Sequence, residues 1–214
     1  MSKEEFLIEL EKLNIIPTKK QLEQLERYYE LLIYWNEKVN LTRIINKEDV
    51  YLKHFYDSLT IVKVVDLNKV NTLLDFGTGA GFPGMVLKIM FPNLKVTLVD
   101  SLQKRINFLD IVIKELDLKD ITTIHERVEN LKDSNFDVIT TRAVANLEKL
   151  LVYTHNLIDN NTKFIPLKAN VAEEIKQAEK VLKKYKLSIV KREEFFLPKE
   201  NSIRNILLIE RRNQ

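Results

Sequence analysis

The 214-residue sequence contains no cysteine. Disulfide bonds, cysteine-based metal sites and catalysis by a cysteine nucleophile are therefore excluded. Long apolar runs are also missing, and no stretch approaches the roughly 20 residues that a membrane span requires. The N-terminus reads Met-Ser-Lys-Glu-Glu-Phe-Leu and lacks the apolar core of a signal peptide. We therefore expect a soluble, cytoplasmic protein.

Glycine is scarce as well, with 4 residues in the whole chain. All of them fall in one short stretch, at Gly77, Gly79, Gly81 and Gly84. Glycine tolerates positive φ and lets the backbone approach a ligand without a Cβ in the way. Four glycines directly after an apolar run predict a strand-to-helix turn with exposed amides. We favour a loop that binds a nucleotide-like cofactor over an ordinary turn.

The composition is that of a globular protein, with 45% hydrophobic and 30% charged residues. The net charge of +3 permits a nucleic-acid partner without requiring one. His54, His125 and His155 lack the spacing of metal ligands, so we expect no metal. Nothing in the pattern indicates an obligate oligomer, and we expect a monomer.

Helical periodicity dominates residues 1–66, where Ser2 with Glu5 and Thr18 with Gln21 have capping-box spacing. From about residue 70, short β-rich runs alternate with helical ones. We predict strands at 72–76, 95–100, 121–124, 136–141 and 164–168, and helices at 84–91, 102–117, 127–131, 146–158 and 170–181. Two further extended runs, 187–197 and 203–210, have no helix between them.

This order predicts an α/β fold with a doubly wound, mostly parallel sheet and a closing antiparallel hairpin. We divide the chain into an N-terminal helical extension, 1–66, and a cofactor-binding domain, 67–214. Ligands of such sheets bind at the carboxyl ends of the strands. The glycine loop follows the first strand and therefore lies at that edge.

Two cofactors are compatible with the loop. Gly79, Gly81 and Gly84 match the dinucleotide pattern, and Asp100 at the end of the second strand could hold a ribose in either case. Asp75, however, places a carboxylate beside the loop, which suits the cationic methionine part of S-adenosylmethionine and repels a pyrophosphate. The wide glycine loop and the closing hairpin also favour S-adenosylmethionine. An NAD-dependent oxidoreductase remains the alternative.

Other candidates follow later strands. We expect Ser101 to cap the next helix, which leaves Asp100 for the ribose. Arg127, Val128 and Glu129 follow the third strand, where an adenine would lie, although a surface ion pair explains the two charges equally well. Arg142 ends the fourth strand, and its planar guanidinium suits a carboxylate or phosphate. Lys168 ends the fifth strand and is either a substrate contact or simply solvated.

With these residues placed, the chain resembles the bacterial small-subunit rRNA guanine-N7 methyltransferases, a family known as RsmG or GidB. The resemblance covers nearly the whole chain. Its matching stretches are W-N-E-K-V-N-L-T at 35–42, H-F-Y-D-S at 54–58, D-F-G-T-G-A-G-F-P-G at 75–84, L-V-D-S-L-Q-K-R at 98–105, R-V-E at 127–129, F-D-V-I-T-T-R-A at 136–143 and P-L-K-A at 166–169. The sequence departs from the family where Ala169 replaces a common glycine and Thr141 a common serine.

The resemblance implies a Rossmann-like class I methyltransferase fold behind the helical extension. It also implies methyl transfer from S-adenosylmethionine to nitrogen 7 of one guanine in 16S rRNA, near the decoding centre of the small ribosomal subunit. By position, the cofactor would be bound by Gly77, Phe82, Asp100, Val128, Glu129 and Arg142, beside Asp75 and Gly79 of the loop. Arg142 and Lys168 would face the RNA.

This chemistry explains why no catalytic residue is assigned. Nitrogen 7 of guanine carries a lone pair and no proton, so the enzyme mainly has to align it with the methyl group. Cytosine-5 methylation would usually need the missing cysteine. A ribosome-assembly factor that binds RNA without catalysis is a further alternative.

Overall fold

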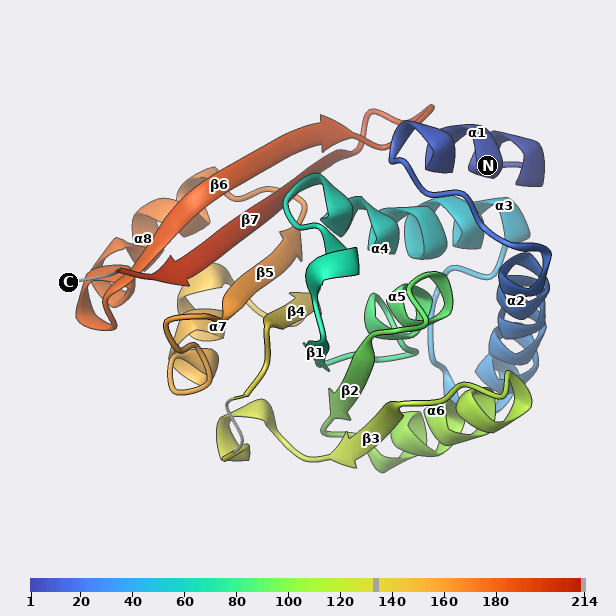
Figure 1. The fold of residues 1–214 in the computed structure, drawn as a ribbon, viewed down its shortest axis with the longest axis horizontal. Helices are drawn as coiled ribbons and strands as arrows, with labels where there is room; N and C mark the ends of the chain where they lie inside the picture. Colours follow the sequence, from blue (N-terminus) through green and yellow to red (C-terminus); the bar gives the residue numbers. More distant parts are fainter. Residues whose placement is uncertain (133–134, 213–214) are drawn as a thin grey trace.

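The computed structural model describes residues 1–132 and 135–212. Its centre is a seven-stranded sheet with the order β3-β2-β1-β4-β5-β7-β6 (Figure 1). The strands are β1 (Thr72–Phe76), β2 (Lys95–Asp100), β3 (Ile121–His125), β4 (Val138–Arg142), β5 (Lys163–Lys168), β6 (Leu187–Phe196) and β7 (Ile203–Arg211). The first five pair in parallel, and β7 pairs antiparallel with both β5 and β6. The predicted parallel sheet and closing hairpin are confirmed.

The strand order reverses at β1, which lies between β2 and β4. Leu73 pairs with Val96 on one side and with Val138 on the other. All but the first residue of β1 are buried, as expected for a central strand covered on both faces. A crevice therefore opens at the carboxyl ends of β1 and β4, where the chain winds in opposite directions.

Helices cover both faces of the sheet. One hydrophobic cluster packs α5 (Gly84–Met90) and α6 (Gln103–Glu115) against the sheet, and a second packs α7 (Leu147–Thr154) and α8 (Ala172–Lys184). The predicted helix near residue 127 is a short 3₁₀ turn, η4 (Val128–Asn130). This arrangement is the doubly wound one that the sequence predicts.

The N-terminal region consists of helices joined by short non-helical connections. It comprises α1 (Lys3–Lys12), α2 (Lys19–Val39), α3 (Lys47–Val50), the π-helix η1 (Tyr51–Tyr56), α4 (Asp57–Leu59) and the 3₁₀ helices η2 (Thr60–Lys63) and η3 (Leu67–Lys69). Both predicted capping boxes are present at α1 and α2. The sequence predicted helical structure over residues 1–66 but not the π-helical turn at Tyr51–Tyr56.

The extension docks on the sheet through helix ends and a shared core. Gln21 Nε2 donates to the carbonyl oxygens of Ile89 (2.9 Å) and Met90 (3.0 Å), at the end of α5. Gln24 Nε2 donates to the carbonyl of Leu116 just after α6 (2.9 Å). These bonds satisfy carbonyls that a helix C-terminus leaves without partners. The domain boundary at residue 66 stays a prediction, because both sides of it contribute to one hydrophobic cluster.

Candidate functional site

The glycine loop leaves β1 in backbone conformations that require glycine. Gly77, Gly79 and Gly81 have φ values of +61°, +62° and +101°. A Cβ on Gly77 would overlap the Val144 side chain, whereas one on Gly79 would meet nothing within 4 Å. The loop therefore combines a tightly packed position with an open one.

Asp75 lies beneath this loop and is fully buried. Its Oδ2 accepts hydrogen bonds from Thr78 Oγ1 (2.6 Å) and the Gly84 amide (2.7 Å), while Oδ1 is buried without a partner. Burial raises the pKa of Asp75 from 3.8 to about 7. An unpaired carboxylate oxygen at this depth is costly unless a cation or a donor approaches it. Asp75 therefore shapes the loop and keeps one oxygen free.

Asp100, at the end of β2, holds the other side of the loop. Its Oδ2 accepts the Gly79 amide (2.9 Å), its Oδ1 accepts the Leu102 amide (3.0 Å), and Arg105 Nη1 reaches both oxygens (3.1 and 3.3 Å). The expectation that Ser101 caps the helix is wrong: Leu102 is the N-cap of α6, no side chain caps it, and Asp100 binds the Leu102 amide instead. A ribose would have to replace Arg105 on this carboxylate.

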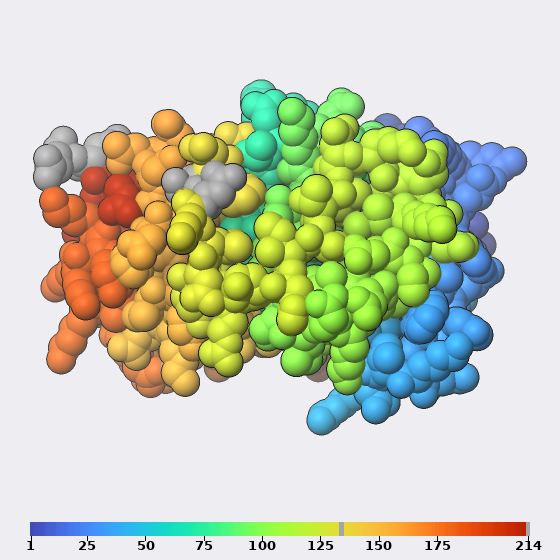
Figure 2. Space-filling model, turned by 90° about the horizontal axis from the view of Figure 1, so that it is seen from below, coloured from blue at the N-terminus to red at the C-terminus, as the bar shows by residue number. Residues whose placement is uncertain are grey.

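A first cavity of about 400 Å³ lies at the ends of β1, β2 and β3 and beside α7. Four predicted residues line it: Gly77, Asp100, Val128 and Glu129. Figure 2 shows the face on which residues near 100, in green, lie next to residues near 126–132 and 135–145, in yellow. Sequence reasoning missed its other wall, where α7 contributes Lys149 and Tyr153. The volume is within the range of small-molecule sites.

A second cavity of about 440 Å³ lies between the helical extension and the ends of β4, β5 and β7. Both predicted RNA-facing residues, Arg142 and Lys168, line it. The structure thus separates them from the residues of the first cavity. Asp75, Gly79 and Phe82 line neither cavity.

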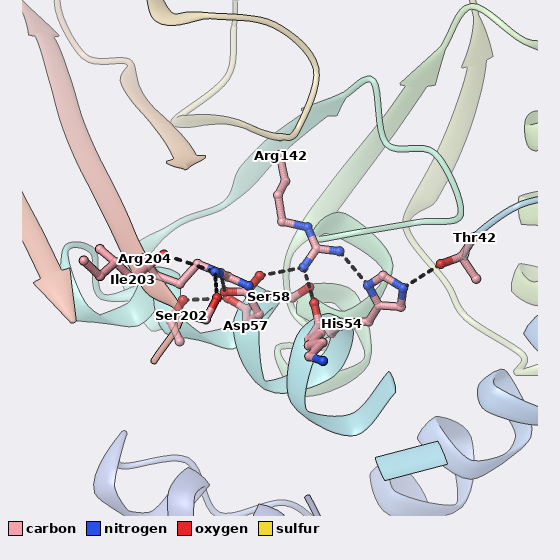
Figure 3. A network of polar contacts seen from close by, with 10 residues as sticks. Thr42, His54, Asp57, Ser58, Arg142, Ser202, Ile203 and Arg204 are labelled. Atoms are coloured by element: carbon pink, nitrogen blue, oxygen red, sulfur yellow. Dashed lines mark hydrogen bonds and ion pairs between the residues drawn. The ribbon is translucent and has the colours of Figure 1, made fainter. Parts of the chain in front are cut away.

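A charged network forms one wall of the second cavity (Figure 3). Arg142 Nη1 donates to Asp57 Oδ2 (2.9 Å) and to the Lys53 carbonyl (2.8 Å), and Arg204 Nε donates to Asp57 Oδ1 (3.1 Å). The Asp57 side chain is 5% exposed, so its charge is compensated by two arginines rather than by water. One carboxylate of the extension thereby fixes arginines of β4 and β7.

His54 completes the network as a neutral ring. Its Nδ1 lies 3.0 Å from Arg142 Nη2, and its Nε2 lies 2.9 Å from Thr42 Oγ1. Burial and the neighbouring arginine lower the pKa of His54 from 6.5 to about 3. Because arginine can only donate, Nδ1 is the acceptor and Nε2 carries the proton. Asn36 holds the segment before the contact, since its Oδ1 accepts the Leu41 and Thr42 amides (2.7 and 2.8 Å).

Phe82 joins the glycine loop to the extension. Its ring stacks on His54 with centroids 4.3 Å apart and on Tyr28 with centroids 5.5 Å apart. The Tyr28 hydroxyl donates to the Ala80 carbonyl inside the loop. The predicted cofactor residue Phe82 is therefore buried beside the loop, where it connects the loop to the network around Arg142.

Lys168 is not a solvated side chain. It is 9% exposed, and its Nζ donates to the Ala145 carbonyl (2.7 Å) and lies 2.9 Å from Glu174 Oε2. The segment it binds separates the two cavities, since Ala143 lines the second and Ala145 the first. Lys168 thus fixes the wall between them.

Most residues of this network were not predicted from the sequence. Thr42, His54 and Asp57 stand in stretches that carry the family resemblance, which was the signal that could have singled them out. Nothing in the sequence pattern marked Arg204 or Glu174. Their importance depends on β5, β7 and the extension meeting in space.

Among residues 1–132 and 135–212, no group of three or more histidine, aspartate and glutamate side chains could hold a metal ion. No helix in these ranges has both the length and the apolar character needed to cross a membrane.

Comparison with known proteins assigns a family. Residues 21–203 match the model described as GidB, rRNA small subunit methyltransferase G. A ribosomal RNA small subunit methyltransferase G from Bacillus pumilus is 46% identical over 220 residues, covering 100% of this chain and 92% of the relative. Its namesake from Bacillus subtilis is 45% identical over 215 residues, covering 98% of this chain and 90% of the relative.

Solved structures agree on the fold. A SAM-dependent methyltransferase from Aquifex aeolicus has a TM-score of 0.56 at 18% identity, covering 77% of this chain and 93% of that one. TYW2 from M. jannaschii, solved in complex with AdoMet, has a TM-score of 0.56 at 14% identity, covering 68% and 71%. At such identities the likeness shows a shared fold.

Proposed function

Because the chain belongs to the GidB family of small-subunit rRNA methyltransferases, we propose that it methylates nitrogen 7 of one guanine in 16S rRNA, near the decoding centre. The family match over residues 21–203 carries this conclusion and favours it over an NAD-dependent oxidoreductase or a non-catalytic assembly factor. The methyl donor of the family is S-adenosylmethionine. We further propose that the protein acts on the small ribosomal subunit or its rRNA, in the cytoplasm and as a monomer.

The first cavity fits this cofactor. S-adenosylmethionine supplies a methyl group on a positively charged sulfur. Gly77 offers bare backbone at the cavity wall. Asp75 lies beneath the same loop and does not line the cavity, and its buried, unpaired Oδ1 favours a cation over an anion at the loop. Asp100 can accept hydroxyl hydrogens of the ribose once Arg105 moves away, while Val128 and Glu129 stand where the adenine is expected.

The second cavity fits the RNA side of the reaction. Arg142 is the proposed contact to the incoming nucleotide, and Asp57 and His54 hold its guanidinium from the extension. Lys168 fixes the segment between the cavities. The extension and the strand ends around Arg142 and Lys168 therefore form the proposed RNA face.

These residues act by alignment. Since guanine nitrogen 7 carries no proton, no general base has to remove one. Correct alignment of reacting groups can lower a barrier by about 7–11 kcal/mol. The fixed side chains of the second cavity suit that task, because Asp57, His54 and the Lys53 carbonyl hold the Arg142 guanidinium in place.

The test is methyl transfer from labelled S-adenosylmethionine to small-subunit rRNA, naked and as particles, from cells that lack this gene and from wild-type cells. We expect label to enter only the deficient RNA, at one guanine that becomes sensitive to borohydride and aniline cleavage. Cofactor binding without label in any of these RNAs would refute the proposed activity.

A further inference from the structure

The second cavity contains two carboxylates that differ in how their oxygens are used. Both oxygens of Asp57 accept from arginines. Glu174 Oε2 accepts the Leu147 amide (2.7 Å) and lies 2.9 Å from Lys168 Nζ, but Glu174 Oε1 has no hydrogen-bonding partner in the described part of the chain. The Glu174 side chain is 26% exposed. One carboxylate oxygen in the cavity wall is therefore available to a ligand.

The two cavities share a wall. Ala143 lines the second cavity, and the next residues, Val144 and Ala145, line the first. Lys168 Nζ holds the Ala145 carbonyl and also pairs with Glu174. A group bound beside Glu174 therefore lies next to the segment that borders the cofactor cavity. The walls also include the apolar side chains of Ile44 and Leu167, which suit the faces of a flat ring.

A carboxylate selects among nucleobases by their donors. The Watson–Crick edge of guanine presents two adjacent donors, N1–H and the N2 amino group, and the two lone pairs of the available oxygen, Glu174 Oε1, can accept both. Adenine and cytosine place a ring-nitrogen acceptor on that edge, which repels a carboxylate, and uracil offers one donor. The cations Arg142 and Lys168 can donate to the guanine O6 or to a phosphate.

We infer that the second cavity receives the target guanine and that Glu174 reads its Watson–Crick edge. This inference rests on the proposed function and adds a specificity-determining residue to it. Recognition through that edge leaves nitrogen 7, on the Hoogsteen edge of the base, uncovered for methyl transfer. Glu174 is thus a substrate contact, whereas Asp57 and His54 are positioning residues.

The test compares guanine with inosine, which lacks the N2 amino group. The RNA is a 16S rRNA fragment ligated with either nucleotide at the position that the wild-type enzyme labels. The variants are Glu174→Gln and, as a matched control, Glu173→Gln. Glu173 is exposed on the same helix, pairs with Lys176 and does not line the cavity.

We expect the wild type and Glu173→Gln to prefer guanine over inosine by about 10- to 100-fold in kcat/KM, the contribution of a hydrogen bond to a charged acceptor. In Glu174→Gln we expect slower methylation of guanine and a preference reduced to about threefold or less, the pattern of a lost pairwise interaction. The affinity for S-adenosylmethionine should stay unchanged.

Two results would overturn the inference. One is a Glu174→Gln enzyme with the wild-type preference for guanine over inosine. The other is a wild-type enzyme that methylates both RNAs equally, a result that does not depend on the folding of any variant. A wild type that labels no guanine in the full-length rRNA or in the particles, from which the fragment is designed, would instead refute the proposed function itself. Glutamine at position 174 can still accept the Leu147 amide, so we expect Glu174→Gln to fold. Circular dichroism and cofactor titration verify this.

Discussion

The two cavities at the carboxyl edge of the sheet are built in different ways. The first is lined by the glycine loop, by Asp100 and by residues that follow β3 and β4, all between positions 76 and 153. The second is lined by side chains of the extension, β4, β5, α8 and β7, with the Asp57–Arg204 pair in one wall. Strand ends of the sheet therefore build the proposed cofactor side, whereas the proposed RNA side also needs charged side chains of the extension.

The difference explains how each cavity responds to change. Backbone conformation governs the first, because the positive φ of Gly77 and Gly79 would strain a residue that carries a side chain. Compensated charge governs the second, because each buried ion needs its partners. Substitutions should thus separate cofactor binding from RNA methylation.

The largest expected effect is that of Arg142→Ala. Loss of the guanidinium leaves Asp57 with Arg204 alone and removes the partner of His54 Nδ1. We expect methyl transfer to fall by about 100-fold or more, as misaligned groups do, while the affinity for S-adenosylmethionine, measured by calorimetric titration, changes little.

Arg142→Lys is the control for charge. It keeps the cation but not the planar fork that contacts Asp57 and His54 together. We expect it to retain the melting temperature better than Arg142→Ala and to remain slow in methyl transfer. An Arg142→Ala enzyme with normal activity would exclude Arg142 from the RNA side.

A change of pH alters the stabilising contributions of Asp75, beneath the glycine loop, and of His54, beside the second cavity, in opposite directions. The folded pKa of Asp75, about 7, lies above its usual 3.8, so its stabilising contribution is present at low pH and is lost as the pH rises through 7. The folded pKa of His54, about 3, lies below 6.5, so its contribution is present above pH 6.5 and is lost as the pH falls towards 3. In the wild type, the pH dependences of these two contributions to the unfolding free energy oppose each other at pH values between the two folded pKa values.

Single variants should expose each dependence. Between pH 5 and 6.5, we expect the unfolding free energy of Asp75→Asn to rise by on the order of 2 kcal/mol, because only His54 remains. That of His54→Asn should fall by a similar amount over the same interval. Urea unfolding at the two pH values measures both, and slopes equal to that of the wild type in both variants would contradict the assignment.

Gly77 and Gly79 form a matched pair within the loop. Both have φ near +60°, so alanine at either position costs about 1–2 kcal/mol of left-handed strain. Only at Gly77 would the added Cβ also overlap Val144, at the wall of the first cavity. We expect Gly77→Ala to bind S-adenosylmethionine about 10-fold more weakly than Gly79→Ala, in line with the cost of overpacking. Equal affinities would place the cofactor elsewhere.

The smallest expected effect is that of Arg105→Ala. Arg105 occupies the Asp100 oxygens that a ribose would use. Its removal frees the Asp100 oxygens for the ribose, so we expect cofactor affinity to stay unchanged or rise by about threefold, although the 1% exposed Asp100 side chain loses its partly buried ion-pair partner. A large loss of affinity in the titration would show that Arg105 itself binds the cofactor.

The sequence was sufficient for the sheet, because alternating β-rich and helical runs determine a doubly wound fold. The sequence also brought Gly77, Asp100, Val128 and Glu129 to one edge of the sheet, since each lies at or just after a strand end, and all four line the first cavity. Their role in binding the cofactor stays a prediction. The Asp57–Arg204 pair could not be predicted, because its members are 147 positions apart and meet only through packing.

The helix start at Ser101 was wrong for a physical reason. A serine is a common N-cap, but Asp100 Oδ1 already binds the Leu102 amide, and α6 begins at Gln103 without a side-chain cap. The spacing of residues alone does not show which of two neighbouring side chains, Asp100 or Ser101, accepts the amide at the start of the helix.

The division of labour between the cavities is tested most directly by hydrogen–deuterium exchange with and without S-adenosylhomocysteine. We predict protection at residues 77–80, 126–130 and 144–149, which surround the first cavity, and little change at 53–57, 167–174 and 203–205. Protection concentrated in the second set would contradict the account, because the cofactor would then occupy the cavity assigned to the RNA.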